Sequence, residues 1–267
     1  MSGWHDGAAW DDGHLRREVF FFRSGGDLLY GSLTAATRPA TSLGLVVCPS
    51  WGQDMADQLE LCHMVARQVA EAGGAGLVYH PPGHGDSAGD MEELTLERLV
   101  TGALDAAAAA GARSAGISWQ LGGVGLGASV AVLATARAGT SVLPLVQPEL
   151  DPAAYFSRLE RFARMGRLGG EGVLFGYALG EGLRAEAQTA DVAGAVSAFT
   201  GRAARIRFST PPPEPIPPSM EDVVVPGEWL QPLYRSDLSA LAGAAARWAV
   251  EAATSGSDRL ASAERGA

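Results

Sequence analysis

The chain has 267 residues, a length typical of one α/β domain that carries an insertion. Hydrophobic residues make up 47% of it, which excludes global disorder, and its net charge of −10 without clustered cations argues against nucleic-acid binding. No apolar stretch reaches the ~18 residues that a membrane-spanning helix needs, and the first residues lack the basic start and apolar core of a signal peptide. We therefore expect a cytoplasmic protein with no nucleic-acid or membrane partner.

The reactive side chains available are few. All 20 basic residues are arginines, which excludes a Schiff-base lysine or a lysine general base. The two cysteines, Cys48 and Cys62, have neither metal-ligand spacing nor the number needed for a disulfide framework. They are typical of small buried apolar residues. We expect no metal site and no cofactor.

The first half of the chain alternates short apolar runs with amphipathic ones. Two runs on either side of Ser24-Gly25-Gly26-Asp27 predict a β-hairpin. Leu43–Cys48 is apolar throughout, as expected for a parallel strand buried on both faces. Thr95 precedes a helical pattern as an N-cap. The expected elements are strands at 17–23, 28–34 and 43–48, a helix at 57–72, a strand at 76–80 and a helix at 95–110.

The second half continues the alternation and interrupts it once. Residues 152–200 predict several short helices with interspersed glycines. This segment has the position and size of a lid inserted over a pocket. The other expected elements are a strand at 117–126, helix 128–138, strands at 142–146, 204–208 and 223–225, and a last helix at 237–253.

This order of elements predicts a mainly parallel sheet with an N-terminal hairpin and helices on both faces. We expect flexible tails at 1–15 and 255–267, a core formed by 16–151 and 201–254, and the helical lid at 152–200. In open α/β sheets, ligands bind at the carboxyl ends of the strands. The residues that directly follow each strand are therefore the candidates for a functional site.

A catalytic motif without its catalytic atom follows the strand expected at 117–126. Gly125-Leu126-Gly127-Ala128-Ser129 stands where a strand-to-helix turn of the form G-x-S-x-G would place a serine nucleophile, and its middle residue is Gly127. All five histidines precede this turn, whereas the motif requires the order serine, acid, histidine. Both observations argue against a conventional serine hydrolase.

The chain resembles the α/β-hydrolase superfamily over roughly residues 18–253. Within it, the chain is similar to the serine-aminopeptidase-like hydrolases, and among these to the branch of exosortase-system-associated hydrolases. The segments that carry the resemblance are CPSWGQDMADQ from Cys48, YHPPGHGDSAGD from Tyr79, GVGLGASVA from Gly123 and LPLVQPELDPAAYFSRLERF from Leu143. The resemblance implies an α/β-hydrolase fold, a Ser-His-acid triad that is degenerate here, and a structural role for His84, Asp86 and Ser87 in their loop.

The resemblance also implies an oxyanion hole built from backbone. The loop that contains Ser50 and Trp51 would supply one N–H donor, and Ala128, the residue after the expected nucleophile position, would supply the other. Backbone donors survive the loss of a serine because they do not depend on side-chain identity. The alternative is that this loop only turns the chain.

Three residues are candidates for acid-base chemistry in such a site: His80, Glu228 and Asp54. His80 ends a strand where relatives often have aspartate, and a buried structural histidine is the alternative. Glu228 stands where the histidine of the family belongs, and a partly apolar pocket would raise the pKa of its carboxyl; the alternative is a solvated loop glutamate. Gln147 and Trp229 are further pocket candidates, and Trp229 equally fits the core.

Three functions are compatible with these observations. The first is a protein that binds a small acyl or polyketide-like ligand under a lid and carries out non-hydrolytic cyclisation, elimination or isomerisation. The second is a pseudoenzyme that binds a ligand, a protein partner or another copy of itself. The third is a serine hydrolase that uses Ser129, because Gly127-Ala128-Ser129-Val130-Ala131 also has small residues on either side of a serine. No histidine follows to activate Ser129, which weighs against the third.

Overall fold

The computed structural model describes residues 8–170, 172–210, 216–228 and 235–265. Its strands are β1 (Ala9–Asp11), β2 (Leu15–Ser24), β3 (Asp27–Ala36), β4 (Leu43–Cys48), β5 (Ala75–Tyr79), β6 (Ser118–Val124), β7 (Val142–Val146), β8 (Val173–Leu174), β9 (Tyr177–Ala178), β10 (Arg202–Thr210) and β11 (Met220–Glu228). Its helices are α1 (Gly52–Glu71), α2 (Leu96–Arg113), α3 (Gly127–Ala138), α4 (Pro152–Gly166), α5 (Glu181–Thr189), α6 (Val192–Ala198) and α7 (Arg235–Arg265).

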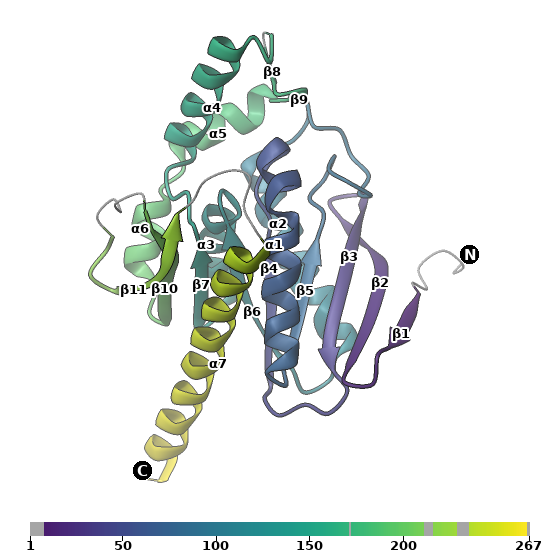
Figure 1. The fold of residues 1–267 in the computed structure, drawn as a ribbon, viewed down its shortest axis with the longest axis vertical. Helices are drawn as coiled ribbons and strands as arrows, with labels where there is room; N and C mark the ends of the chain where they lie inside the picture. Colours follow the sequence, from purple (N-terminus) through teal and green to yellow (C-terminus); the bar gives the residue numbers. More distant parts are fainter. Residues whose placement is uncertain (1–7, 171, 211–215, 229–234, 266–267) are drawn as a thin grey trace.

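Nine of these strands form one mixed sheet in the order β1-β2-β3-β5-β4-β6-β7-β10-β11 (Figure 1). The first strands pair antiparallel as far as β3 with β5, and the pairs from β5 to β11 are parallel. The expected hairpin is confirmed, with its turn at Gly25 and Gly26, whose φ values of +55° and +99° suit glycine. The mainly parallel sheet predicted from the sequence is therefore present.

Helices cover both faces of the sheet, and each face has its own core. On one face α1 packs against α7, and the apolar side chains between them and the sheet form one buried cluster. On the other face α2 packs against α3, and α6 also contacts α3. Strands β4, β5 and β7 are buried along their whole length, which explains why their sequences are continuously apolar.

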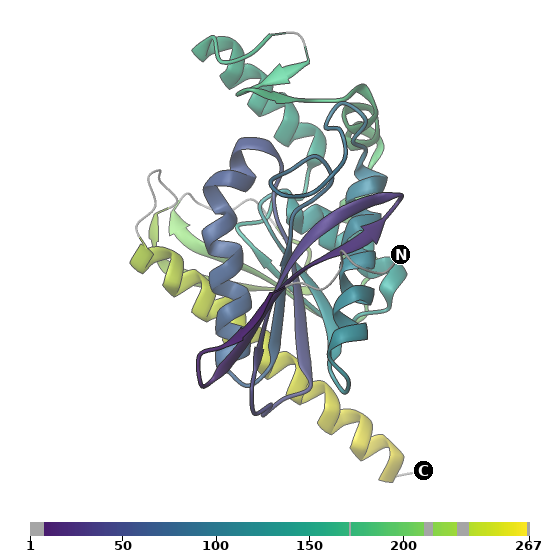
Figure 2. The same ribbon diagram turned by 90° about the vertical axis from the view of Figure 1, so that its right-hand side faces the viewer.

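The segment between β7 and β10, residues 152–200, lies largely beyond the carboxyl ends of the parallel strands, and we call it the covering segment. It contains α4, the small β8-β9 hairpin, α5 and α6. Figures 1 and 2 both show α4 and the β8-β9 hairpin standing at the end of the molecule opposite the C-terminus. The rest of the segment reaches back to the body of the protein: α5 contacts α2, and α6 contacts α3 at the side of the sheet.

Both expected tails contain regular structure. Ala9–Asp11 forms β1, which pairs with β2 because its backbone groups can bond to the otherwise open edge of the sheet. At the other end, α7 continues to Arg265, although its apolar periodicity ends near Ala252. Nothing in that extension stops the helix, since it has no proline and its single glycine only lowers helix propensity. None of the helices formed by the described residues has the length and hydrophobicity of a bilayer-crossing segment.

Candidate functional site

The sharp turn between β6 and α3 centres on Gly125. Its φ of +58° lies in the region that only glycine adopts readily. The Gly125 N–H donates to the carbonyl of Val146 at 3.1 Å, and its own carbonyl accepts from the N–H groups of Ala128 and Glu149 at 3.1 and 3.0 Å. In a nucleophile elbow, the residue at this strained turn carries the nucleophile. Gly125 therefore holds the nucleophile position, and it has no side chain.

This geometry corrects the expected position of Gly127. Gly127 is the first residue of α3, and a Cβ there would overlap the carbonyl oxygen of Cys48. A Cβ on Gly123 would overlap the backbone of Gly127. The motif is thus Gly123-Val124-Gly125-Leu126-Gly127, two residues earlier than expected, with small residues on either side of the turn. The sequence allows either register because glycines alternate through the segment, and only the backbone torsion separates them.

The space above Gly125 is filled by two side chains from other elements. A Cβ on Gly125 would lie 2.7 Å from Oε1 of Gln58, on α1, and 3.0 Å from Oγ of Ser50, in the loop after β4. The Ser50 hydroxyl also accepts a hydrogen bond from the N–H of Leu126 at 3.2 Å. Leu126 follows the turn residue, so its N–H is the elbow donor of an oxyanion hole. That donor is already occupied by a side chain of the same protein.

The expected second donor, Ala128, is used differently. Its N–H donates to the Gly125 carbonyl and so closes the first turn of the helix. Ala128 is fully buried. The Ala128 N–H is therefore engaged within α3, and the residue directly after the turn is Leu126, two positions earlier.

His84 holds the loop that contains Ser50 and Trp51. Its Nε2 accepts from the Gly52 N–H at 3.0 Å, while its Nδ1 lies 3.0 Å from the Pro82 carbonyl, which requires the proton on Nδ1. Burial lowers the pKa of His84, and its hydrogen bond to Pro82 opposes that shift. His84 is therefore a neutral structural residue, as the resemblance implied.

His80 is also committed to a loop. The Asp86 N–H donates to its Nδ1 at 3.0 Å, and its ring lies 4.7 Å from that of Tyr30. The Ser87 hydroxyl donates to the His80 carbonyl at 2.6 Å, which closes the same turn. Burial lowers the pKa of the His80 imidazole, and the Asp86 carboxylate works in the opposite direction. These contacts fit the structural alternative for His80.

Asp54 is the sequence-predicted acid-base candidate that lies beside the Ser50 loop. It sits in the first turn of α1, and the hydroxyl of Tyr155, on α4, donates to its Oδ2 at 2.9 Å. Burial raises the pKa of Asp54, and the hydrogen bond from Tyr155 opposes that shift. Burial also raises the pKa of Tyr155 well above its usual range, with a further contribution from Asp54, while a hydrogen bond with Ser50 opposes the increase. Tyr155 was missed at sequence level, because only the fold brings α4 against α1.

Aromatic side chains of the covering segment close over the same loop. Trp51 is 1% exposed, and its ring lies 5.4 Å from that of Phe156 and 6.2 Å from that of Tyr177. Tyr155 is fully buried beneath them. The loop that contains Ser50 and Trp51, predicted to line a pocket beneath a lid, is packed under α4 and β9.

Ser129 has a structural role in this arrangement. It is fully buried in α3, and its hydroxyl donates to the Glu149 carbonyl at 2.5 Å. Gln147, at the end of β7, adopts a φ of +45°, and its N–H donates to the Ile206 carbonyl at 2.8 Å. The Nε2 atom of Gln147 and the Oε1 atom of Gln58 are both buried without a hydrogen-bond partner among the described residues. Gln58 was not recognised from the sequence, since nothing local distinguishes it from other polar residues of α1.

Two expected site residues remain predictions. Glu228 is the last residue of β11, in register with Thr210, and its side chain lies outside the described part of the chain. Trp229 lies outside the described residues altogether.

The described residues contain no group of three or more histidine, cysteine, aspartate or glutamate side chains placed to hold a metal ion. Cys48 and Cys62 are free and buried, and burial raises the pKa of the Cys48 thiol to about 12 and that of Cys62 further. Both thiols are thus protonated and unreactive at neutral pH.

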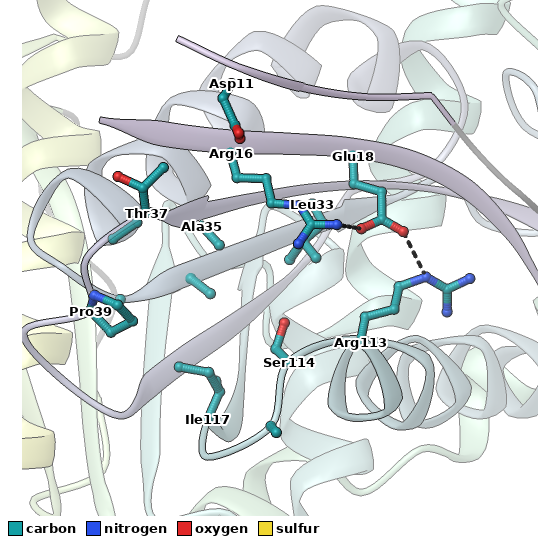
Figure 3. Close-up of a pocket in the computed structure, with 14 residues that line it drawn as sticks. Asp11, Arg16, Glu18, Leu33, Ala35, Thr37, Pro39, Arg113, Ser114 and Ile117 are labelled. Carbon is teal, nitrogen blue, oxygen red and sulfur yellow. Dashed lines mark hydrogen bonds and ion pairs between the residues drawn. The ribbon is translucent and has the colours of Figure 1, made fainter. Parts of the chain in front are cut away.

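A cavity of about 380 Å³ lies at the opposite end of the sheet, near the amino ends of the parallel strands (Figure 3). Glu18 stands at its rim and pairs with Arg113 at 3.2 Å and with Arg16 at 3.5 Å. The two arginines of this cavity thus share one carboxylate. Ligands of open α/β sheets bind at the other edge of the sheet. The elbow edge remains the candidate site.

A scan against protein-family models finds no match for this sequence, and a search of curated proteins finds none either. Solved structures do match. The chain is 19% identical to Est1E of Butyrivibrio proteoclasticus, solved with ferulic acid bound, over 87% of this chain and 98% of that one, with a TM-score of 0.60. It is 15% identical to an α/β serine hydrolase homologue from Coxiella burnetii, over 86% and 96%, with a TM-score of 0.59. It is 16% identical to the lidless serine hydrolase XC6422 of Xanthomonas campestris, over 87% and 95%, with a TM-score of 0.55.

These likenesses, together with the strand order, show the class of protein. The chain has the α/β-hydrolase fold, with a mainly parallel sheet and helices on both faces. The fold alone does not determine an activity.

Proposed function

We propose that this protein is a pseudoenzyme of the α/β-hydrolase fold, which acts by binding and not by serine hydrolysis. The observation that supports it best is the filled elbow: Gly125 has no side chain, and Gln58 and Ser50 occupy the space that a nucleophile would need. A substrate carbonyl would also compete with Ser50 for the N–H of Leu126. Reaching the geometry of a hydrolase would require both groups to move.

The remaining triad positions support the same proposal. No histidine follows the elbow in the sequence, and His80 and His84, which precede it, are engaged in loop hydrogen bonds. Ser129 is buried and donates to a backbone carbonyl. A serine hydroxyl without a base is a weak nucleophile.

A hydrolysis assay tests this proposal. Purified protein is incubated with p-nitrophenyl acetate, p-nitrophenyl butyrate and alanine p-nitroanilide, beside the variants Ser50→Ala and Ser129→Ala. We expect the wild type and both variants to give the same background rate. Turnover that disappears in Ser129→Ala, or in Ser50→Ala, would overturn the proposal and identify the serine that is responsible.

A second function is favoured by the polar groups beneath the covering segment. The half-buried Asp54 and the buried Tyr155 form a hydrogen-bonded pair beside the Ser50 loop, and the amides of Gln58 and Gln147 have buried atoms without a partner among the described residues. If α4 moves away, these groups line a site for a small acyl-type ligand and for non-hydrolytic acid-base chemistry. Buried polar atoms without partners are unusual in native proteins, which is why they support a ligand.

Thermal unfolding with acyl N-acetylcysteamine thioesters separates the two functions. A ligand that enters beneath α4 raises the melting temperature of the wild type, and less so that of Tyr155→Phe, since the hydroxyl has been removed from the site. Mass spectrometry of the recovered thioester then distinguishes binding from chemistry. Equal melting temperatures with and without every thioester would eliminate this second function.

A further inference from the structure

The outer part of the covering segment exposes large apolar side chains. Phe162 is 47% exposed, Met165 76%, Leu168 54% and Val173 36%. These are four of the seven large hydrophobic residues that are exposed among the described residues, and they fall within twelve positions. We call this region, residues 161–168 with Val173, the tip. An exposed apolar concentration of this kind marks an interaction surface, because scattered single residues are the ordinary case.

Three arginines share the tip with these side chains. Arg161, Arg164 and Arg167 are exposed, and none of them forms an ion pair within the described part of the chain. The guanidinium of Arg161 lies 5.6 Å from the ring centre of Phe162. The tip therefore combines cations with apolar groups, in a chain whose net charge is −10.

Two other arginines, one in α4 and one in α5, form ion pairs. Arg158 pairs with Glu149 at 2.5 Å, and Arg184 pairs with Glu160 at 2.8 Å. The arginines that face the body of the protein thus have carboxylate partners. Those at the tip have no carboxylate partner among the residues that the structure describes, which leaves their positive charge open to an external group.

The construction of α4 explains how one helix carries both kinds of surface. Its inward residues Tyr155, Phe156 and Ala163 are buried against the Ser50 loop and the core. Phe162 and Met165 lie on its other side and contribute nothing to that core. Their exposure cannot be explained by folding, because a polar residue at either position would leave the buried contacts of α4 unchanged.

We propose that the tip docks on the surface of an anionic phospholipid bilayer. One guanidinium group can bind two phosphate oxygens at once. Exposed phenylalanine, methionine and leucine side chains insert at the boundary between headgroups and acyl chains. Figures 1 and 2 show α4 and the β8-β9 hairpin projecting at one end of the molecule, where a flat surface can reach them. Glu160, the carboxylate next to Arg161 on α4, pairs with Arg184, and salt screens the repulsion from carboxylates more than about 8 Å away.

This docking would be peripheral and reversible, and it revises the sequence-based expectation of no membrane contact. An anionic bilayer attracts each arginine near its surface, while the four apolar residues provide a modest inserted area. The inference does not depend on the proposed loss of hydrolysis, since the tip contains none of the elbow residues.

Vesicle sedimentation tests the proposal with the full chain. The protein is mixed with sucrose-loaded vesicles of phosphatidylcholine alone, or of phosphatidylcholine with about one-third phosphatidylglycerol, at low and high salt. We expect sedimentation with the anionic vesicles only, and release at high salt. The triple variant R161Q/R164Q/R167Q should lower the partition coefficient about 100-fold, and F162S/M165S should also lower it.

A matched control changes the same charge elsewhere. The variant R16Q/R23Q/R38Q removes three arginines that are far from α4 in the sequence. It should bind anionic vesicles as the wild type does, apart from the loss that its more negative net charge causes. Melting curves confirm that each variant is folded. Equal sedimentation of the wild type and R161Q/R164Q/R167Q would overturn the proposal. A second result would also overturn it: the wild type does not bind anionic vesicles but forms a concentration-dependent dimer, and the triple variant abolishes this dimer. The tip would then be a self-association surface.

Discussion

The elbow and the tip of the covering segment differ in how their polar groups are used. At the elbow, polar groups are engaged within the chain: the N–H of Leu126, the residue after the turn, donates to Ser50, and His84 accepts from the N–H of Gly52 in the neighbouring loop. At the tip, three arginines have no carboxylate partner among the described residues, and the apolar side chains beside them are exposed. The tip, which we propose to be an interaction surface, is thus separate from the elbow, where the fold would place a nucleophile.

The largest expected effect comes from placing a serine at Gly127. Its Cβ would overlap the Cys48 carbonyl, and backbone on both sides cannot yield easily. We expect Gly127→Ser to reduce the free energy of unfolding by more than about 3 kcal/mol, measured by urea denaturation. Gly111→Ser is the matched control, because its nearest neighbour would be 3.8 Å away and serine has the better helix propensity. A Gly127→Ser variant as stable as the control would disprove the elbow register.

A smaller effect is expected from the contact between α4 and α1. Tyr155→Phe removes the hydroxyl that donates to Asp54 and leaves a buried carboxylate without that donor. We expect a loss of about 2 kcal/mol in the free energy of unfolding. Tyr177→Phe serves as the control in the same segment, and it should change stability little. If both variants unfold at the same urea concentration, the covering segment is not held to α1 through Tyr155.

Acidification should weaken the fold through the buried histidines. Burial lowers the pKa values of His63, His80 and His84 below the usual 6.5, so the unfolded chain binds more protons than the folded one just below that pH. These histidines therefore cause no loss of stability above about pH 6.5. Below that pH the free energy of unfolding falls by at most about 1.4 kcal/mol per histidine and pH unit.

Urea denaturation at several pH values measures this dependence. Asp54, whose pKa is raised, acts in the opposite direction, because its buried carboxylate becomes less unfavourable when protonated. The series is therefore repeated with Asp54→Asn, where the loss on acidification should be steeper. A free energy of unfolding that stays constant from pH 7 to about pH 5 in both proteins would show that these histidines are not buried as described.

The smallest effect is expected at Ser129. Its hydroxyl makes one hydrogen bond, to the Glu149 carbonyl, so Ser129→Ala should lose about 1 kcal/mol of stability. The melting curve of Ser129→Ala checks this value. A variant with unchanged stability would show that the hydroxyl does not link α3 to the loop after β7.

Much of the fold follows from local sequence. The Ser24–Asp27 turn, the apolar run at Leu43–Cys48 and the cap at Thr95, which accepts from the Arg98 N–H, all lie where their residue types predict them. These features depend on neighbours along the chain, and so the sequence is sufficient for them. The helical extension to Arg265 was missed because apolar periodicity, which marks a packed face, ends before the helix does.

The candidate site could be predicted only in part. The loop at Ser50 and Trp51 and the position of Asp54 follow from the order of strands. The register at Gly125 depends on a backbone torsion, which a run of glycines leaves undetermined. Gln58 and Tyr155 reach the site from helices that the sequence does not place side by side, and their contacts fill space in which the sequence predicted a pocket beneath a lid.

The central claim is that no serine of this protein acts as a nucleophile, and covalent labelling tests it most directly. The protein is incubated with a fluorophosphonate, and its intact mass is compared with that of an active serine hydrolase treated in the same way. We predict that the mass of this protein stays unchanged while the control gains one adduct. A stoichiometric adduct on this protein, mapped by peptide sequencing to Ser50 or Ser129, would contradict the account.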